Sequence, residues 1–459
     1  MITRKILVFV LVLNCLIGES QTRRFKHLTS ADGISQSEIY AFLEDSRGFV
    51  WIGTVDGLNR YDGYNIKIFN TGINDPHSLS SNTIRSLAED RLGRIWIGTD
   101  DGLNAYDPKT ELVYQIDINS GEKRFPVWSL HIQNGHLLLG TTNGIWRTSI
   151  RSNSVKKIES EFYKIKRFSN KSQIGAVRSI INCSHGGNWI IAQNNLSRIV
   201  FQENTQEPVI FEDIAFSYFG DQRVATEDST GNLWIASREN GLLKYNPITK
   251  KAYHYSAADT PDGPSSNKCS SLTIDKDGNL WLGTLDGGLN FIKSDDLNSD
   301  TVRFETILNQ PHDVNSLNSN LISSLYVSKN NLLWIGTIGA GVNIYNPEHK
   351  KFTHYRFTNQ DTILSNSNFI RAVYVDDENR IWTGTHASGL LLYNRNSNRF
   401  QKLGFDLESV FFIAGYKEDK KFICCGSGLY LVQLINGKLR ILSYLKDVPI
   451  FYIEKSKPD

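Results

Sequence analysis

The sequence has little methionine, little proline and no long apolar run beyond its N-terminus. One Met and eleven Pro among 459 residues argue against both a helical bundle and a disordered chain. After the first twenty residues no stretch reaches the length of about 18 apolar residues that a membrane helix requires. We therefore expect a mature chain that does not cross a membrane.

The sequence also has almost no net charge. Fifty Lys and Arg residues against 48 Asp and Glu residues give a formal charge of +2, and removal of Arg4, Lys5 and Glu19 with a leader peptide lowers it to +1. A near-neutral chain gives no reason to expect nucleic acid or an acidic membrane surface as a partner.

The cysteines form no recognisable framework. Cys183, Cys269, Cys424 and Cys425 are either far apart or adjacent, which fits neither a disulfide scaffold nor a zinc motif. We expect buried free thiols, with a Cys424–Cys425 vicinal disulfide as the alternative in an oxidising compartment. We expect no metal and no cofactor.

Residues 1–20 have the features of a secretory signal peptide. Arg4 and Lys5 precede the apolar run Ile6–Leu13, and Gly18 and Ser20 stand at the −3 and −1 positions of a cleavage site. The apolar run is too short for a membrane span. A lipid anchor is the weaker alternative, because the candidate cysteine at position 15 follows a large polar residue.

One short phrase recurs nine times along the chain. It consists of an aromatic residue, an apolar run, Gly-Thr and then Gly-Leu, and it is clearest at Trp51–Leu58 and Trp96–Leu103. Weaker copies begin, at steps of 40 to 53 residues, at Leu138, Trp189, Trp234, Trp281, Trp334, Trp382 and Phe422. This period, carried by short β-like runs, is typical of a β-propeller with four-stranded blades. The predicted fold class is all-β.

The second repeat shows how one blade would form. Strands are predicted at Ile84–Ala88, Ile95–Thr99, Leu103–Tyr106 and Val113–Ile116, with turns that contain Gly between the first three. Each blade lies between two others, so both of its faces are apolar. We interpret the tryptophans as core between blades; platforms for stacking sugars are the alternative.

The segment Phe25–Leu28 resembles a fourth strand without its own blade, and it recurs as Phe352–Tyr355. Such a strand can complete the last blade of a ring. We therefore predict a seven-bladed β-propeller at 21–350, followed at 351–459 by two blades and a fragment of a second, incomplete propeller.

The last residues add a further expectation. Phe451–Lys455 aligns with Leu272–Lys276, the strand before Trp281, so a tenth repeat would begin where the sequence stops. A domain that ends inside a hairpin leaves an open sheet edge. We expect the chain to be a fragment of a longer protein.

The full pattern Asp-x-x-Gly-x-x-Trp-Ile-Gly-Thr-x-x-Gly-Leu-x-x-Tyr-Asp, best matched at 45–62 and 90–107, resembles the two-component regulator propeller repeat. The resemblance covers nearly all of the mature chain. It implies the periplasmic sensor region of a hybrid two-component system that recognises oligosaccharides. In that family two seven-bladed propellers precede an immunoglobulin-like domain, a membrane helix and a histidine kinase.

The kinase and the other transmitter parts are absent from this sequence. We therefore expect no catalytic residues, no enzyme activity and an oligosaccharide partner. The membrane histidine kinase, which the family carries in the same chain, is missing here, and a dimer is left open.

A candidate ligand site follows from the alignment of the repeats. Eleven residues before the aromatic position of each of the first seven copies, with one gap in the third, stand Tyr40, Arg85, Trp128, Arg178, Arg223, Ser270 and Ser323. If that strand is innermost, these residues converge on the central channel. Three guanidinium groups and two aromatic rings there would suit a glycan. The alternative is that Arg is habitual at this position and pairs with acidic neighbours.

The sequence leaves open two other functions and two other sites. A scaffold for protein–protein interaction is the second function, because fold does not fix function. A glycan-cleaving enzyme such as a sialidase or a lyase is the third, but Tyr40 has no Glu at an equivalent ring position. His131 and His136 could mark a ligand-facing third blade, although an ordinary variable blade is favoured. Asp275–Asn279 resembles a calcium loop only superficially, and a hairpin turn is favoured.

Overall fold

The computed structural model describes residues 23–450, except 119–123, 153–154, 156–157, 159–161, 166–174, 194, 202–208, 216–219, 260–261, 298, 300–301, 348–368, 379, 395–398, 404–408, 417–419, 436–437 and 447–449. The predicted signal peptide, the predicted strand Phe352–Tyr355 and the aligned segment Phe451–Lys455 lie outside the described residues. The chain divides into two compact units, Met1–His349 and Lys350–Asp459, which are described separately.

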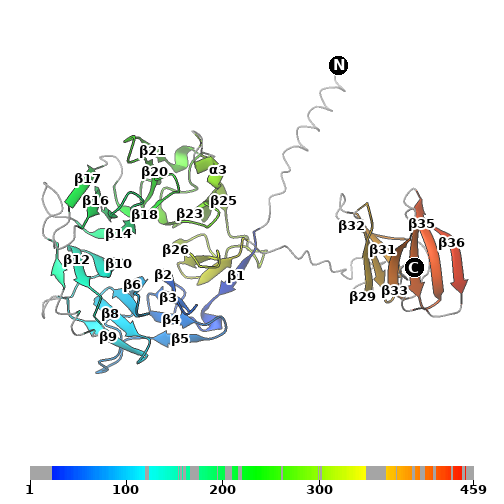
Figure 1. Cartoon of the computed structure of the whole chain (residues 1–459), viewed down its shortest axis with the longest axis horizontal. Helices are drawn as coiled ribbons and strands as arrows, with labels where there is room; N and C mark the ends of the chain where they lie inside the picture. Colours follow the sequence, from blue (N-terminus) through cyan, green and yellow to red (C-terminus); the bar gives the residue numbers. More distant parts are fainter. Residues whose placement is uncertain are drawn as a thin grey trace, which may run out of the picture. The chain divides into compact units, whose positions relative to one another are not determined.

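The described part of the first unit contains seven four-stranded antiparallel sheets. Six of them consist of four consecutive strands, and the seventh has the order β1-β28-β27-β26. The first strands of successive sheets contact one another in a closed cycle, from β2 through β6, β10, β14, β18, β22 and β26 back to β2. Figure 1 shows these strands on the inner side of the ring.

The strands of the first three consecutive sheets are β2 (Ile39–Glu44), β3 (Val50–Thr54), β4 (Gly57–Tyr61), β5 (Ile66–Phe69), β6 (Ile84–Glu89), β7 (Ile95–Thr99), β8 (Gly102–Asp107), β9 (Leu112–Ile116), β10 (Val127–Gln133), β11 (His136–Thr141), β12 (Gly144–Ser149) and β13 (Tyr163–Lys164). The next three sheets contain β14 (Val177–Asn182), β15 (Asn188–Ala192), β16 (Asn195–Val200), β17 (Val209–Ala215), β18 (Gln222–Glu227), β19 (Leu233–Ser237), β20 (Leu242–Tyr245), β21 (Ala252–Tyr255), β22 (Cys269–Ile274), β23 (Leu280–Thr284), β24 (Leu289–Ile292) and β25 (Glu305–Ile307). The seventh contains β1 (Phe25–Leu28), β26 (Ile322–Val327), β27 (Leu333–Thr337) and β28 (Val342–Tyr345).

The N-terminal strand β1 completes the seventh sheet. It pairs antiparallel with β28, from Phe25 opposite Tyr345 to Leu28 opposite Val342. The first and the last strands of the unit therefore share one sheet, as the orphan-strand interpretation of Phe25–Leu28 predicted.

The Gly of each Gly-Thr pair lies where one sheet packs against the first strand of the next. A Cβ atom added at Gly98 would lie 2.6 Å from the carbonyl oxygen of Val127 in β10. A Cβ at Gly336 would lie 2.8 Å from the Cβ of Ile39, which joins the seventh sheet to the first. Glycine is required at these positions because any side chain would force the sheets apart.

The Asp and Trp of the repeat form one buried hydrogen-bonded unit. Trp96 Nε1 donates to Asp90 Oδ2 over 3.0 Å, while Asp90 Oδ1 accepts the amides of Leu92 and Arg94. The same Trp-to-Asp bond, 2.7 to 3.0 Å long, joins Trp51 to Asp45, Trp234 to Asp228, Trp281 to Asp275 and Trp382 to Asp376. These indoles are at most 2% exposed, so the prediction that they form core is confirmed. Asp275 belongs to a hairpin turn of this kind, as expected.

Two of the seven repeats that have Trp at this position lack the carboxylate. Cys183 and Ser328 stand where the other repeats place Asp, six residues before Trp189 and Trp334. The Nε1 atoms of both tryptophans are buried without a hydrogen-bond partner. An unsatisfied buried donor is costly, so these two blades are locally weaker than the others.

Helical structure is sparse. The described residues contain the short 3-10 helices η1 (Ser30–Asp32) and η2 (Ala257–Asp259) and the one-turn helix α3 (Ser294–Leu297). Within the described ranges, no helix combines the length and the apolarity that crossing a bilayer demands. The prediction of an all-β chain is confirmed.

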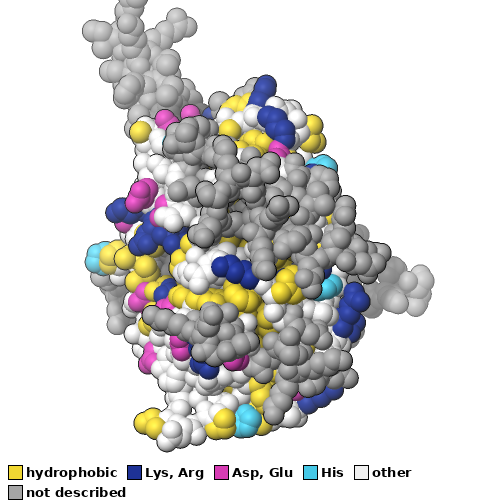
Figure 2. All heavy atoms as spheres, turned by 90° about the vertical axis from the view of Figure 1, so that its left-hand side faces the viewer, with side chains coloured by type: hydrophobic (Ala, Val, Ile, Leu, Met, Phe, Trp, Pro, Cys, Tyr) yellow, Lys and Arg dark blue, Asp and Glu magenta, His cyan; other side chains and the backbone are white. Residues whose placement is uncertain are grey.

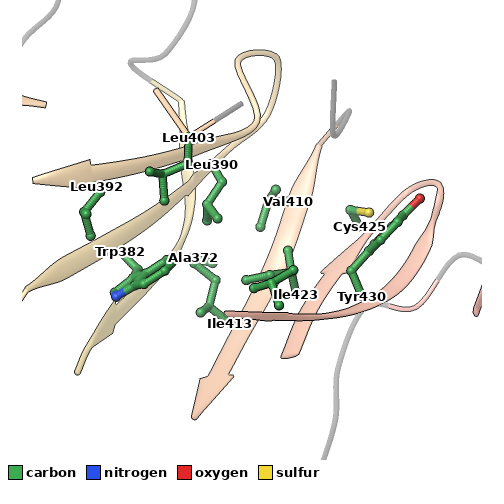
Figure 3. Packing of buried hydrophobic residues seen from close by; sticks show 11 residues of the cluster. Ala372, Trp382, Leu390, Leu392, Leu403, Val410, Ile413, Ile423, Cys425 and Tyr430 are labelled. Carbon is green, nitrogen blue, oxygen red and sulfur yellow. The ribbon is translucent and has the colours of Figure 1, made fainter. Parts of the chain in front are cut away.

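The second unit contains two four-stranded sheets in its described part. Their strands are β29 (Ile370–Val375), β30 (Ile381–Thr385), β31 (Leu390–Asn394), β32 (Arg399–Lys402), β33 (Val410–Tyr416), β34 (Lys420–Cys425), β35 (Gly428–Ile435) and β36 (Lys438–Lys446). Figure 3 shows Trp382 and Leu390 of one sheet meeting Val410 and Ile423 of the other in a shared core. The four cysteines of the described chain are free and buried, so no vicinal disulfide forms.

Candidate functional site

All seven residues predicted from the repeat alignment occupy the same structural position. Each is the second residue of the first strand of its sheet, and the register between the first and second strands shifts at that residue. A bulge of this kind leaves one residue unpaired and redirects its side chain. The positions are Tyr40, Arg85, Trp128, Arg178, Arg223, Ser270 and Ser323, one on each of the mutually contacting inner strands.

Two of the arginines stack on aromatic rings from the preceding sheet. The guanidinium carbon of Arg85 lies 4.5 Å from the ring centroid of Tyr40, and that of Arg178 lies 3.4 Å from the ring of Trp128. Such cation–π contacts hold the planar guanidinium groups in fixed orientations. The bulges therefore bring together residues that are far apart in the sequence.

Acidic partners neutralise two of the three arginines. Arg85 Nε and Nη2 donate to the two carboxylate oxygens of Asp100 over 2.7 and 2.8 Å. Arg223 Nη2 donates to Asp221 Oδ2 over 2.9 Å. For these two residues the structure agrees with the alternative interpretation, in which Arg pairs with acids near the strand ends.

Arg178 is different. Its Nε atom, like that of Arg223, is buried without a hydrogen-bond partner, but among the described residues no carboxylate lies within salt-bridge distance of its guanidinium group. Burial, followed by the nearby charges of Arg223, Arg238 and Arg85, lowers the pKa of Arg178 to about 10, and Asp221 opposes this shift. The group stays protonated at neutral pH, in a cationic cluster in which the Nε donors of both Arg178 and Arg223 lack a partner.

Ser270 and Ser323 form hydrogen bonds between neighbouring sheets of the ring. Ser270 Oγ donates to the carbonyl oxygen of Ile322 over 2.6 Å, and Ser323 Oγ donates to that of Ile39. In each case the acceptor belongs to the first strand of the next sheet. Their hydroxyl hydrogens are thus engaged in joining blades and are not available to a ligand.

Four residues of this site were not found from the sequence: Glu38, Asp100, Asp221 and Arg238. They lie in the connections before the first strands or after the second strands, which differ from repeat to repeat. Because the alignment compared one strand position only, it could not find side chains that approach Tyr40 and the three arginines from these loops.

Glu38 changes one earlier inference. The hydroxyl of Tyr40 donates to its carboxylate, so a Tyr–Glu pair does stand beside an arginine cluster, although not at the equivalent ring position. Burial and then Glu38 raise the pKa of Tyr40 above its usual value. A phenol that is harder to ionise is a poorer nucleophile, which weighs against sialidase-like chemistry.

The two histidines of the third sheet lie away from this bulge. His131 is near the other end of β10, where its Nε2 atom is 3.0 Å from Asn182 Oδ1. Burial lowers the pKa of both His131 and His136, so both are predominantly neutral at neutral pH. The expectation of an ordinary variable blade is consistent with this placement.

The outer side of the ring presents a weaker candidate for a ligand-binding site. In Figure 2, the described cationic and anionic side chains of the visible face are interspersed with one another. A polar pocket of about 240 Å³ lies at the outer strands, lined by Asn232, Lys244, Asn246, Thr249, Lys251, Tyr253, Tyr255 and Ser299. It combines Lys244 and Lys251 with Tyr253 and Tyr255 but contains no guanidinium group.

The fold and the repeated buried unit define a β-propeller protein. The family model "Two component regulator propeller" matches residues 33–56, 78–101, 263–286 and 316–339, so four stretches of the chain are similar to this repeat. A histidine kinase, P4, from Formosa agariphila is 35% identical over 75 residues, which are 16% of this chain and 6% of the kinase.

Two of the solved structures that resemble this chain match more than nine tenths of it. They are extracellular domains of putative hybrid two component systems from B. thetaiotaomicron. One is 21% identical with a TM-score of 0.55, and the match covers 91% of this chain and 53% of that one. The other is 19% identical with a TM-score of 0.59, covering 92% and 60%. The chain therefore spans less than two thirds of each of these relatives, and the structural likeness supports the propeller fold.

Proposed function

We propose that this chain is an extracytoplasmic sensor module that binds an oligosaccharide carrying an anionic group, such as a carboxylate or a sulfate. The observation that carries the proposal is Arg178, stacked on Trp128 with an unpaired buried Nε. The repeat family and the extracellular placement of the structural relatives support the sensor role.

The charge balance at the channel favours an anion. Arg85 and Arg223 each have an acidic partner, whereas Arg178 and Arg238 have none among the described residues. A ligand carboxylate or sulfate would accept from the Arg178 guanidinium group and offset the burial and the repulsion that lower its pKa. The indole of Trp128 and the phenol ring of Tyr40 supply apolar surface against which a sugar ring can stack.

In a two-component system, occupancy of this site would be reported to a histidine kinase. We propose that the chain acts outside the cytoplasm, in the periplasm, and that the kinase is its signalling partner, since the curated relative is itself a histidine kinase. The module needs no catalytic group for this role.

Titration calorimetry of the purified chain tests the proposal. Size-matched neutral and uronate-containing oligosaccharides are compared, first with the native chain and then with Arg178→Gln. A charged hydrogen bond contributes about 1.5–3 kcal/mol, so we expect Arg178→Gln to weaken the acidic ligand roughly 10- to 100-fold. Added salt should weaken the acidic ligand alone.

Arg371 provides a matched control. It stands at the same bulge position in the second unit, where its guanidinium carbon lies 4.9 Å from the ring of Phe411. Arg371→Gln should leave the affinity unchanged. Equal binding of neutral and acidic sugars, or equal effects of the two substitutions, would refute the proposed role of Arg178.

The same experiment separates the enzyme alternative. The Tyr40–Glu38 pair beside the arginines is the one feature that favours a glycosidase. Chromatography of the ligands after prolonged incubation should recover them intact. Release of a cleaved sugar that is lost in Tyr40→Phe would replace the sensor proposal by an enzymatic one.

A further inference from the structure

A second cluster of functional groups lies between the fourth and fifth sheets. Cys183 and His185 belong to the turn between β14 and β15, and Glu227 ends β18 of the next sheet. One ligand atom from each of the three side chains lies within 4.8 Å of the other two. Within the described part of the chain, no other group of three His, Cys, Asp or Glu side chains meets this criterion.

The equivalent position in the first repeat shows what has changed. There the turn contains Asp45 and Arg47. Arg47 Nη2 forms a 2.9 Å ion pair with Asp45 Oδ2. Glu89 of the next sheet accepts from the backbone amide and hydroxyl of Ser46, as Glu227 accepts from those of Ser184. The fourth repeat thus keeps the Ser–Glu contact.

At the two remaining positions of that turn, the fourth repeat replaces both members of the Asp–Arg pair. Cys183 stands for Asp45 and His185 for Arg47. The exchange of Asp for Cys leaves Trp189 Nε1 without an acceptor, so it has a structural cost. A thiol and an imidazole beside a retained carboxylate are the ligand types that borderline-soft divalent ions prefer.

We propose that Cys183, His185 and Glu227 form a zinc-binding site that joins the fourth and fifth blades. A thiolate, a neutral imidazole and a carboxylate together carry two negative charges, which balance one Zn²⁺ ion. Three protein ligands leave the fourth tetrahedral position to water.

The three ligand atoms need to move only slightly closer together to bind one ion. Zinc bonds of about 2.0–2.3 Å place neighbouring tetrahedral ligands roughly 3–4 Å apart. His185 Nδ1 and Glu227 Oε1 are already 4.0 Å apart. Ser184 N donates to Glu227 Oε2 over 3.0 Å and would keep the carboxylate oriented once Oε1 turned to the ion.

The sequence contains no recognisable zinc motif, for a physical reason. A Cys-x-His pair is too short to resemble a known zinc spacing, and the third ligand comes from another repeat. Only the packing of two blades brings the three together.

Metal binding by the intact chain tests the site. After equilibrium dialysis against Zn²⁺ and removal of free ion, elemental analysis should find one bound equivalent. Substitution with Co²⁺ should produce the absorption band of a thiolate–cobalt bond. Cys183→Ser, His185→Ala and Glu227→Gln should each lose the tightly bound equivalent, and Cys183→Ser should also lose the band.

Matched controls separate metal loss from misfolding. Glu89→Gln alters the equivalent Ser–Glu contact in a turn without Cys or His, and Cys269→Ser removes a buried thiol from another blade. Both should retain the metal. Cys183→Ser is expected to fold, because Ser328 is tolerated at the equivalent position. Absence of bound zinc in the native chain, or unchanged stoichiometry in all three ligand variants, would overturn the proposal.

Discussion

The Asp–Trp hydrogen bond of the repeat can be tested by adding it to the seventh sheet, where Trp334 Nε1 has no partner. In five described repeats a carboxylate accepts the Trp Nε1 proton, whereas Ser328 Oγ accepts only the amide of Leu332, over 3.0 Å. The backbone of this turn already matches the others, because Asn331 N donates to the Ser328 carbonyl just as Gly278 N donates to that of Asp275. Ser328→Asp should therefore place an oxygen beside Trp334 Nε1 without moving the chain.

The expected gain follows from the cost of a buried donor without a partner. That cost is about 1–3 kcal/mol, from which part must be subtracted for desolvation of the new carboxylate. We expect the free energy of unfolding to rise by about 1–2 kcal/mol. With an unfolding entropy of roughly 2 cal/mol/K per residue, each kcal/mol raises the melting temperature of a unit of this size by roughly 1.5 °C.

Urea unfolding followed by tryptophan fluorescence measures the change. Asp275→Ser is the reciprocal control, because it removes the acceptor of Trp281 Nε1. It should lower the free energy of unfolding by about 1–3 kcal/mol. In a Trp334→Phe background, Ser328→Asp should lose its benefit because no donor remains. A gain that persists in that background, or no gain in the native one, would show that the Asp–Trp bond is not what stabilises the blade.

Two further predictions concern the ring. Gly98→Ala should cost about 1–3 kcal/mol in urea unfolding, because its Cβ would lie 2.3 Å from Ser86 Oγ and 2.6 Å from the Val127 carbonyl oxygen. Gly175→Ala, where no atom lies within 4 Å of the added Cβ, should be nearly neutral, and equal costs would contradict the close-approach explanation. Burial raises the pKa of Tyr255 to about 12, so the folded state holds this proton more tightly than the unfolded state, whose pKa is near 10. Stability from this group is complete below pH 10 and is lost as the pH rises from 10 to 12. Tyr255→Phe should remove that part of the loss in unfolding midpoints measured across this range, and an unchanged slope would be evidence against it.

The repeated elements could be predicted because each sheet uses the same local chemistry. Gly-Thr marks contact with the next sheet, and Asp followed by Trp marks a buried turn, so a single alignment located the second strands of all nine described sheets. The same alignment found the bulge position of Arg178. It predicted neither that Ser270 and Ser323 would bond to the next blade nor that Arg178 alone among the three ring arginines would lack an acidic partner.

What escaped prediction depends on side chains that approach from different repeats. Asp100 and Asp221 neutralise Arg85 and Arg223 from loops of unlike length. Cys183 and Glu227 meet only across a blade interface. Periodicity describes what the blades share, whereas these contacts arise where individual blades depart from it.

The pairing of β1 with β28 has a consequence for how the chain reaches its native state. During synthesis, Phe25–Leu28 emerges before the other described strands of its unit, yet its partner Val342–Tyr345 is the last of them to appear. Phe25–Leu28 must therefore stay unpaired until nearly the whole ring of sheets has been synthesised. Contacts between such distant parts of a chain form slowly, and an edge strand left open in the meantime invites pairing with other molecules. Pairing of Phe25–Leu28 with β28 is thus the step that closes the ring.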